Sequence, residues 1–140
     1  MSFPVVPVPV VVDASVVIGA ATDEPPAMAA LDAVQARVLL APPLIWVETA
    51  NVLVKRKHFS VPDAVFVLRS MERLGLESAD RGFDGLVEAM ALADKHALSV
   101  YDAIYLWLAL DIDGELATLD RDLAKAAEAE GVPLAIKIDG

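Results

Sequence analysis

The sequence contains no cysteine. This absence excludes disulfide bonds, thiolate nucleophiles and cysteine-ligated zinc, and it fits a reducing compartment. Basic residues are also scarce, because 11 Lys and Arg stand against 21 Asp and Glu, which gives a formal net charge of −10. A uniformly acidic surface repels phosphate backbones. Nucleic-acid binding would therefore need a local basic patch or metal ions held in an acidic pocket.

Long hydrophobic runs are missing as well, although apolar residues make up 56% of the chain. No apolar stretch approaches the roughly 20 residues that span a bilayer. The apolar N-terminus has no basic lead and is interrupted by prolines, so it is a poor signal peptide. We therefore expect a cytoplasmic protein without a membrane span. The length of 140 residues predicts a single domain, residues 1–140, with space for a generous core.

Short apolar runs alternate with longer amphipathic segments along the chain. The apolar runs predict strands at residues 8–12, 38–41, 74–79, 115–119 and 132–136. The segments between them predict helices at residues 15–21, 25–37, 43–57, 60–74, 83–97, 99–112 and 120–131. This alternation predicts an α/β fold with a parallel sheet covered by helices on both faces.

Four acidic residues stand out because their neighbours are apolar. Asp13 follows VVV, Glu48 lies within LIWVETANVL, Asp102 precedes AIYLWLAL and Asp120 follows ELATL. A fifth acid, Asp122, comes two residues after Asp120. Such neighbours usually mark buried segments, where an unpaired charge is costly. Each acid therefore needs an explanation.

Taken singly, each acid has a structural explanation. Asp13 and Asp120 precede predicted helices and are suited to cap them. Asp102 lies three residues after a serine, which is the spacing of a capping box. Glu48 could pair with Lys55, two helical turns further along the same segment.

Taken together, the acids indicate a common site. Asp13 and Asp120 follow predicted strands, and the C-terminal ends of parallel strands lie at one edge of a sheet. The helices that carry Glu48 and Asp102 could point those acids at the same crevice. Crowded carboxylates repel one another, so cations are expected there. Oxygen ligands without His or Cys suit Mg²⁺ or Mn²⁺, which can bind phosphate and activate water.

Four fragments, in this order and spacing, resemble the PIN-domain family and, within it, the VapC-like toxin ribonucleases of toxin–antitoxin pairs. The fragments are VVVDASVVIG, WVETANVLVK, SVYDAIYLWLA and LATLDRDLAKAA. The family's metal-binding and catalytic acids match Asp13, Glu48, Asp102 and Asp120, and an acid found in only some members matches Asp122. Supporting polar positions of the family match Ser15, Asn51 and Thr118.

The resemblance also implies properties of the whole protein. It implies a three-layer α/β/α PIN-like fold with a central parallel sheet of about five strands. It implies Mg²⁺- or Mn²⁺-dependent endonuclease cleavage of RNA, a homodimer, and neutralisation by a small antitoxin protein. The proline-rich N-terminus is not a family feature, and we assign it no role.

Several other residues carry open interpretations. The basic run Lys55, Arg56 and Lys57 could bind RNA phosphates beside the cut, or it could be a solvated helix end. His58 and His96 lie in polar helix ends and are expected at the surface. The aromatic residues of the apolar helices are expected in the core or a dimer interface, with RNA stacking as the alternative. They are Trp46, Tyr101, Tyr105 and Trp107.

Two other functions compete with a nuclease. The first is a non-catalytic interaction module that keeps the fold and uses its acids as helix caps. The second is a phosphoryl-transfer protein of the receiver or phosphatase type, which also places Asp after strands. The second expects an early acidic pair and a lysine after a late strand, and the sequence fits that pattern poorly. Metal binding distinguishes the nuclease from the module.

Overall fold

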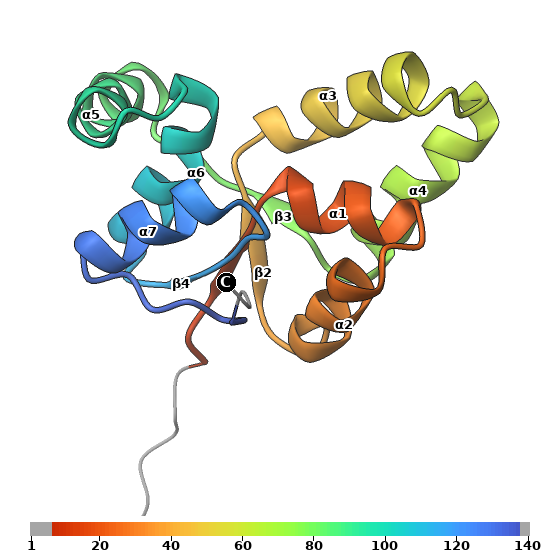
Figure 1. Cartoon of the computed structure of the whole chain (residues 1–140), viewed down its shortest axis with the longest axis horizontal. Coiled ribbons are helices and arrows are strands. Elements are labelled where there is room, and N and C mark those ends of the chain that lie inside the picture. Colours follow the sequence, from red (N-terminus) through yellow and green to blue (C-terminus); the bar gives the residue numbers. More distant parts are fainter. Residues whose placement is uncertain (1–6, 138–140) are drawn as a thin grey trace, which may run out of the picture.

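The computed structural model describes residues 7–137, so part of the proline-rich N-terminus lies outside it. Short strands alternate with helices, as the sequence predicts (Figure 1). The elements are β1 (Val10–Val12), α1 (Ala14–Ala21), α2 (Pro25–Val34), β2 (Leu39–Ala41), α3 (Leu44–Asn51), the π-helical turn η1 (Val52–Arg56), α4 (Val61–Arg73), β3 (Glu77–Ser78), α5 (Gly82–His96), α6 (Val100–Asp111), β4 (Glu115–Ala117) and α7 (Arg121–Ala129).

The sheet is parallel throughout, with the strand order β3-β2-β1-β4. The expected count of about five strands is wrong, because residues 132–136 contribute only a single bridge between Leu134 and Leu116. Pro133 has no backbone N–H to donate, so it cannot extend the hydrogen-bond ladder. Its carbonyl accepts the backbone N–H of Leu116 at the bridge. The predicted strand at residues 74–79 is likewise shortened to β3.

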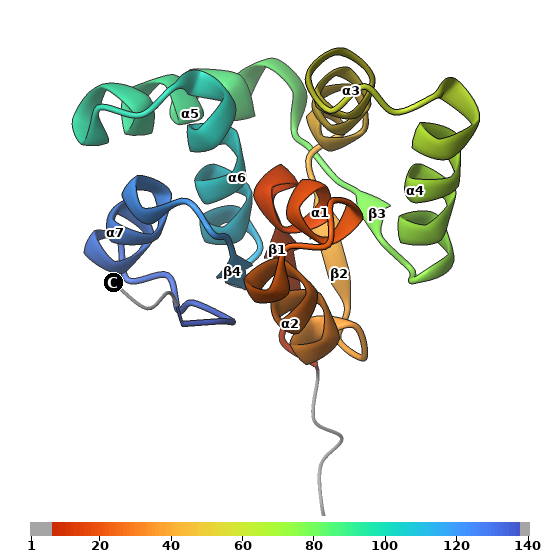
Figure 2. The same cartoon turned by 45° about the vertical axis from the view of Figure 1, so that its right-hand side comes forward.

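The central strand β1 is short but fully buried. Val10, Val11 and Val12 are each 0% exposed, as expected of a central strand covered on both faces. Helices α5, α6 and α7 gather on one side of the sheet and α1 to α4 on the other (Figure 2). The protein is therefore a three-layer α/β/α fold. Within residues 7–137, no helix is long and apolar enough to cross a bilayer.

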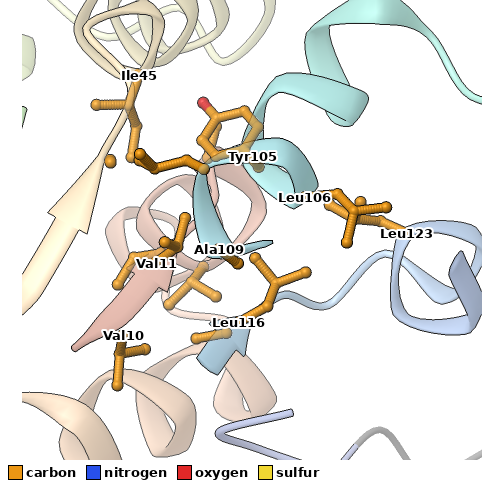
Figure 3. Close-up of a cluster of buried hydrophobic side chains, with 14 of the residues drawn as sticks. Val10, Val11, Ile45, Tyr105, Leu106, Ala109, Leu116 and Leu123 are labelled. Carbon is orange, nitrogen blue, oxygen red and sulfur yellow. The ribbon is translucent and has the colours of Figure 1, made fainter. Parts of the chain in front are cut away.

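Helix α6 is the central helix of the core. It packs against β1 and β4, and its apolar side chains are buried around nearly the whole helix. Tyr105 lies among the apolar side chains of this core, and its hydroxyl group points toward α3 (Figure 3). A buried tyrosine hydroxyl needs a hydrogen-bond partner, and the partner that it finds belongs to the candidate site.

The predicted helix at residues 43–57 changes its winding halfway. It is α-helical as far as Asn51 and continues as the π-helical turn η1, in which Lys57 donates its backbone N–H to the carbonyl of Val52. A π-turn inserts one extra residue and is frequent at functional sites. Side chains after Asn51 are therefore rotated away from the faces that a regular helix would give them.

Candidate metal centre

Asp13 lies at the C-terminal end of β1 and is the N-cap of α1. Its Oδ1 accepts hydrogen bonds from the backbone N–H of Ser15 at 3.1 Å and from the Ser15 hydroxyl at 2.5 Å. Its Oδ2 accepts a hydrogen bond from the hydroxyl of Thr118 at 2.5 Å. The side chain is only 4% exposed. The capping role predicted for Asp13 is confirmed, and it occupies Oδ1, while Oδ2 faces the neighbouring strand turn.

The turn after β4 lies beside the turn after β1, because these two strands are neighbours in the sheet (Figure 2). Ser15 joins the two turns, since its hydroxyl oxygen accepts the backbone N–H of Leu119 at 2.9 Å. Thr118 accepts the backbone N–H of Asp120 at 3.0 Å. Asp120 in turn caps α7 by accepting the N–H of Leu123 at 3.0 Å. Asp13 and Asp120 are thus held on the same edge of the sheet.

Glu48 comes from α3 on the other side of this edge. Its Oε2 accepts a hydrogen bond from the hydroxyl of Tyr105 at 3.3 Å. The pairing of Glu48 with Lys55 that the sequence allowed does not form. Burial raises the pKa of Glu48, the charge of Asp102 raises it further, and the Tyr105 hydrogen bond lowers it. Burial and the charge of Glu48 also raise the pKa of Tyr105, which keeps its proton.

Asp102 is the acid whose charge interacts with that of each of the others. It stands in the first turn of α6, where the Ser99 hydroxyl accepts the backbone N–H of Asp102 at 3.1 Å. Burial raises the pKa of Asp102, and repulsion from Asp120 and Asp122 raises it further. Asp102 in turn repels the carboxylates of Asp13 and Glu48. The structure therefore brings each of the other predicted acids within electrostatic range of Asp102.

The electrostatic cost is largest at Asp13. Burial raises the pKa of this carboxyl from 3.8 to about 7, although hydrogen bonds from Ser15 and Thr118 oppose the shift. A carboxylate with such a pKa is only partly ionised at neutral pH. A divalent cation nearby would favour the charged form, as it does for other coordinating groups.

The acids do not form a ready-made ligand set. Within residues 7–137, no group of three or more Asp, Glu or His side chains stands close enough together to hold an ion directly. The donor set nevertheless fits Mg²⁺ or Mn²⁺ in chemistry, because it consists of carboxylate oxygens with no His or Cys. Mg²⁺ also retains several waters in proteins and needs only one or two direct carboxylates. The residues present therefore fit a partly hydrated ion.

The supporting residues divide between the site and its surroundings. Ser15 and Thr118 hold Asp13 by the hydrogen bonds described above. Asn51 is exposed, and it lines a surface groove together with Glu48 and Asp102. Lys55, Arg56 and Lys57 are all exposed. Of these three cations, Arg56 lines the groove that contains Glu48 and Asp102.

The two histidines lie away from these acids. His58 is exposed, as the sequence predicts. The surface placement predicted for His96 is wrong, because its side chain is mostly buried and its Nε2 lies 2.6 Å from Glu130 Oε2. The contact between the end of α5 and the end of α7 explains this burial.

Sequence reasoning missed the role of Tyr105. The sequence predicts a place in the core or a dimer interface for Tyr105, and the residue is in the core with 1% exposure, but its hydroxyl also contacts the site through Glu48. The available signal was spacing, since Tyr105 lies three residues after Asp102 and such residues share a helix face. The sequence contains no comparable signal for η1 or for the rotation of the side chains that follow Asn51.

Comparisons with known proteins agree with this fold. The model of the PIN domain family matches residues 10–129. The chain is 52% identical over 48 residues to Ribonuclease VapC3 of Pyrobaculum aerophilum, a match that covers 34% of this chain and only 37% of that protein.

Two solved structures share the fold. PAE2754 from Pyrobaculum aerophilum superposes with a TM-score of 0.63 at 24% identity, covering 85% of this chain and 84% of that one. VapC20 of Mycobacterium tuberculosis, a toxin that cleaves the sarcin–ricin loop, superposes with a TM-score of 0.70 at 17% identity, covering 84% and 94%. The family match spans both strand turns and both helices that carry the acids, and by it this chain belongs to the PIN domain family.

Proposed function

We propose that this protein is a Mg²⁺- or Mn²⁺-dependent endoribonuclease that acts in the cytoplasm as the toxin of a toxin–antitoxin pair. The observation that carries the proposal is the gathering of mutually repelling acids, one of them buried and most of the others half-buried, at the C-terminal edge of the sheet of a PIN domain. Similarity to Ribonuclease VapC3 and to VapC20 supports RNA as the substrate. If the acids served only as helix caps, each would need to satisfy local backbone amides alone, and nothing would require them to lie at one site.

In this proposal Asp13, Glu48, Asp102 and Asp120 hold the cation, and Asp122 adds negative charge at its edge. When bound, the ion supplies Lewis acidity that activates water and neutralises charge on the scissile phosphate. Such an ion would also relieve the repulsion that raises the pKa of Asp102. It would give an acidic protein a local attraction for a polyanionic substrate.

The neighbouring hydrogen bonds keep the acids in position. The hydroxyls of Ser15 and Thr118 each donate to one oxygen of Asp13, so this carboxylate cannot rotate freely. The buried Tyr105 donates a hydrogen bond to Glu48, and Glu48 also lines a surface groove together with Asp102. Preorganised ligands of this kind avoid reorganisation during the reaction.

The direct test is cleavage of single-stranded RNA by the purified protein with Mg²⁺ or Mn²⁺. We expect cleavage to stop when EDTA is added and to be lost in Asp13→Asn, because this variant removes a central carboxylate. Asp32→Asn is the matched control, since Asp32 is an exposed acid on α2. Undiminished cleavage by folded Asp13→Asn would contradict the proposal. Absence of both cleavage and metal binding in the native chain would favour the interaction module.

A homodimer is part of the same proposal, and α5 offers a surface for it. Its side chains Phe83, Leu86, Val87 and Met90 follow the spacing of one helix face and are between 39% and 77% exposed. A contiguous exposed apolar face commonly marks an interface. A second copy related by a two-fold axis would cover this face with its own equivalent.

Light scattering after gel filtration tests this interface. We expect the native protein to have the mass of a dimer and Val87→Lys to have that of a monomer. Val61→Lys is the control, because Val61 is a similarly exposed valine on α4. A dimer that survives Val87→Lys would place the interface elsewhere, and a monomeric native protein would contradict it. The antitoxin partner would be tested separately, by its inhibition of RNA cleavage.

A further inference from the structure

A groove of about 460 Å³ adjoins the acids, between the α3–η1 segment and the start of α6. Its acidic end contains Glu48 and Asp102, and its other polar residues are Asn51, Ser99 and Arg56. The groove is also lined by Leu44, Val47, Val52 and Tyr101. It therefore combines the candidate metal ligands with a cation and an aromatic ring.

Tyr101 is the unusual member of this groove. The other aromatic residues of α6, Tyr105 and Trp107, are 1% and 6% exposed, whereas Tyr101 is 61% exposed. Within residues 7–137, Tyr101 makes no hydrogen bond or ring contact that would explain its presence. It lines the same groove as Asp102, the residue that follows it in the chain. An aromatic residue in this position leaves a π-face open to a ligand.

Arg56 faces the groove because of the π-helical turn. In a regular helix, the residue two turns after Glu48 is about seven positions further on, which is Lys55. The extra residue of η1 shifts this position by one, and it is Arg56 rather than Lys55 that lines the groove. Arg56 forms no ion pair with any acid in residues 7–137. Its guanidinium group is available to a phosphate.

We propose that this groove binds one unpaired nucleotide of the RNA, with its base stacked on Tyr101 and its phosphate held by Arg56. The inference rests on the proposed nuclease function and adds to it a nucleotide-binding subsite formed by Tyr101 and Arg56. A base can stack on an exposed ring only if it is free of its own duplex, so the groove selects single-stranded segments or loops. The guanidinium group of Arg56 and the ring of Tyr101 lie in one groove with the acid Asp102. This combination of groups is more complementary to a nucleotide than to an apolar peptide.

Binding of a fluorescein-labelled single-stranded oligoribonucleotide, followed by fluorescence anisotropy, tests the proposal. Ca²⁺ replaces Mg²⁺, and a gel confirms that the RNA stays intact. We expect Tyr101→Ala to weaken binding on the order of tenfold, the effect of losing one stacked base, and Tyr101→Phe to bind as the native protein does. Phe66→Ala is the control, because Phe66 is a 66% exposed aromatic residue on α4, outside the groove.

The role of Arg56 is tested separately in the same assay. Arg56→Gln should reduce the dependence of log Kd on log salt concentration by about 0.7, the amount for one phosphate contact to a single strand. Arg69→Gln, a variant of an exposed arginine on α4, should leave this slope unchanged. Binding of a duplex RNA of the same sequence should not depend on Tyr101.

The outcomes separate this inference from the proposed function. If the native protein cleaves and binds RNA but Tyr101→Ala binds equally well, the inference is overturned and the nuclease proposal stands. The groove would then suit a segment of another protein. If the native protein neither binds nor cleaves RNA, both fail. Equal thermal midpoints of the Tyr101 variants, expected for so exposed a residue, exclude unfolding as the cause of weaker binding.

Discussion

Replacing Asp13 with Asn in metal-free protein changes how stability depends on pH. Burial raises the pKa of Asp13 from 3.8 to about 7. Between these values the folded protein retains a proton that the unfolded chain releases. The free energy of unfolding therefore falls as pH rises, and the loss is complete once pH passes the folded pKa. A carboxyl group with a depressed pKa would give the opposite sign.

The size of the effect follows from the width of this window. From about pH 5 to a folded pKa of about 7 lie roughly two pH units, each worth about 1.4 kcal/mol, so native stability should fall by about 3 kcal/mol. Asn cannot titrate, so Asp13→Asn should lose most of this dependence. At about pH 8 the whole shift of the Asp13 pKa, from 3.8 to about 7, destabilises the native protein by about 4 kcal/mol. Asp13→Asn should therefore be more stable than the native protein there by roughly 3 kcal/mol, after loss of about one hydrogen bond is subtracted.

Urea denaturation in EDTA measures this difference, with the fluorescence of the buried Trp107 as the signal. The matched control is Asp32→Asn, which should follow the native curve because Asp32 is exposed. A shallow dependence should remain in Asp13→Asn, because the pKa values of Glu48 and Asp102 are also raised. Native stability that rises over this range, or an Asp13→Asn curve parallel to the native one, would refute the reasoning.

Three further substitutions test the packing and the site. Thr49→Val should raise the free energy of unfolding by about 1 kcal/mol in urea denaturation, because the buried Thr49 hydroxyl has no hydrogen-bond partner in residues 7–137; a loss of stability would show that it has one. Gly85→Ala should cost about 1–3 kcal/mol, since the added Cβ would lie 2.7 Å from Trp107 Cη2, and unchanged stability would contradict this close contact. Tyr105→Phe should weaken Mn²⁺ binding several-fold in calorimetry, because Glu48 loses the hydrogen bond that fixes it; unchanged affinity would limit Tyr105 to the core.

The order of elements and the placement of the acids could be predicted from sequence for one reason. Short, β-branched apolar runs such as VVV favour buried strands. A parallel sheet puts whatever follows each strand at the same edge. Asp13 and Asp120 are therefore neighbours although 107 positions separate them. The prediction needed topology but no side-chain detail.

What the sequence could not predict depends on backbone hydrogen bonds and on exposure. The apolar pattern of residues 132–136 favours a strand, but only one bridge forms there. Pro133 lacks the N–H that a longer ladder needs, and the apolar pattern does not reveal this effect. The π-helical turn exchanges Lys55 for Arg56 in the groove, although both lie in the same basic run. Tyr101 and Tyr105 occupy one apolar helix, and only their packing separates an exposed ring from a buried one.

The central claim is that acids distant in sequence form one site for a divalent cation. Titration of Mn²⁺ into EDTA-treated and dialysed protein, followed by isothermal calorimetry, tests it most directly. The account predicts saturable binding to the native chain and to Asp32→Asn, and loss of binding in Asp13→Asn and Asp102→Asn. Native protein that binds no Mn²⁺, or Asp13→Asn and Asp102→Asn variants that bind it as tightly as the native chain, would contradict the account.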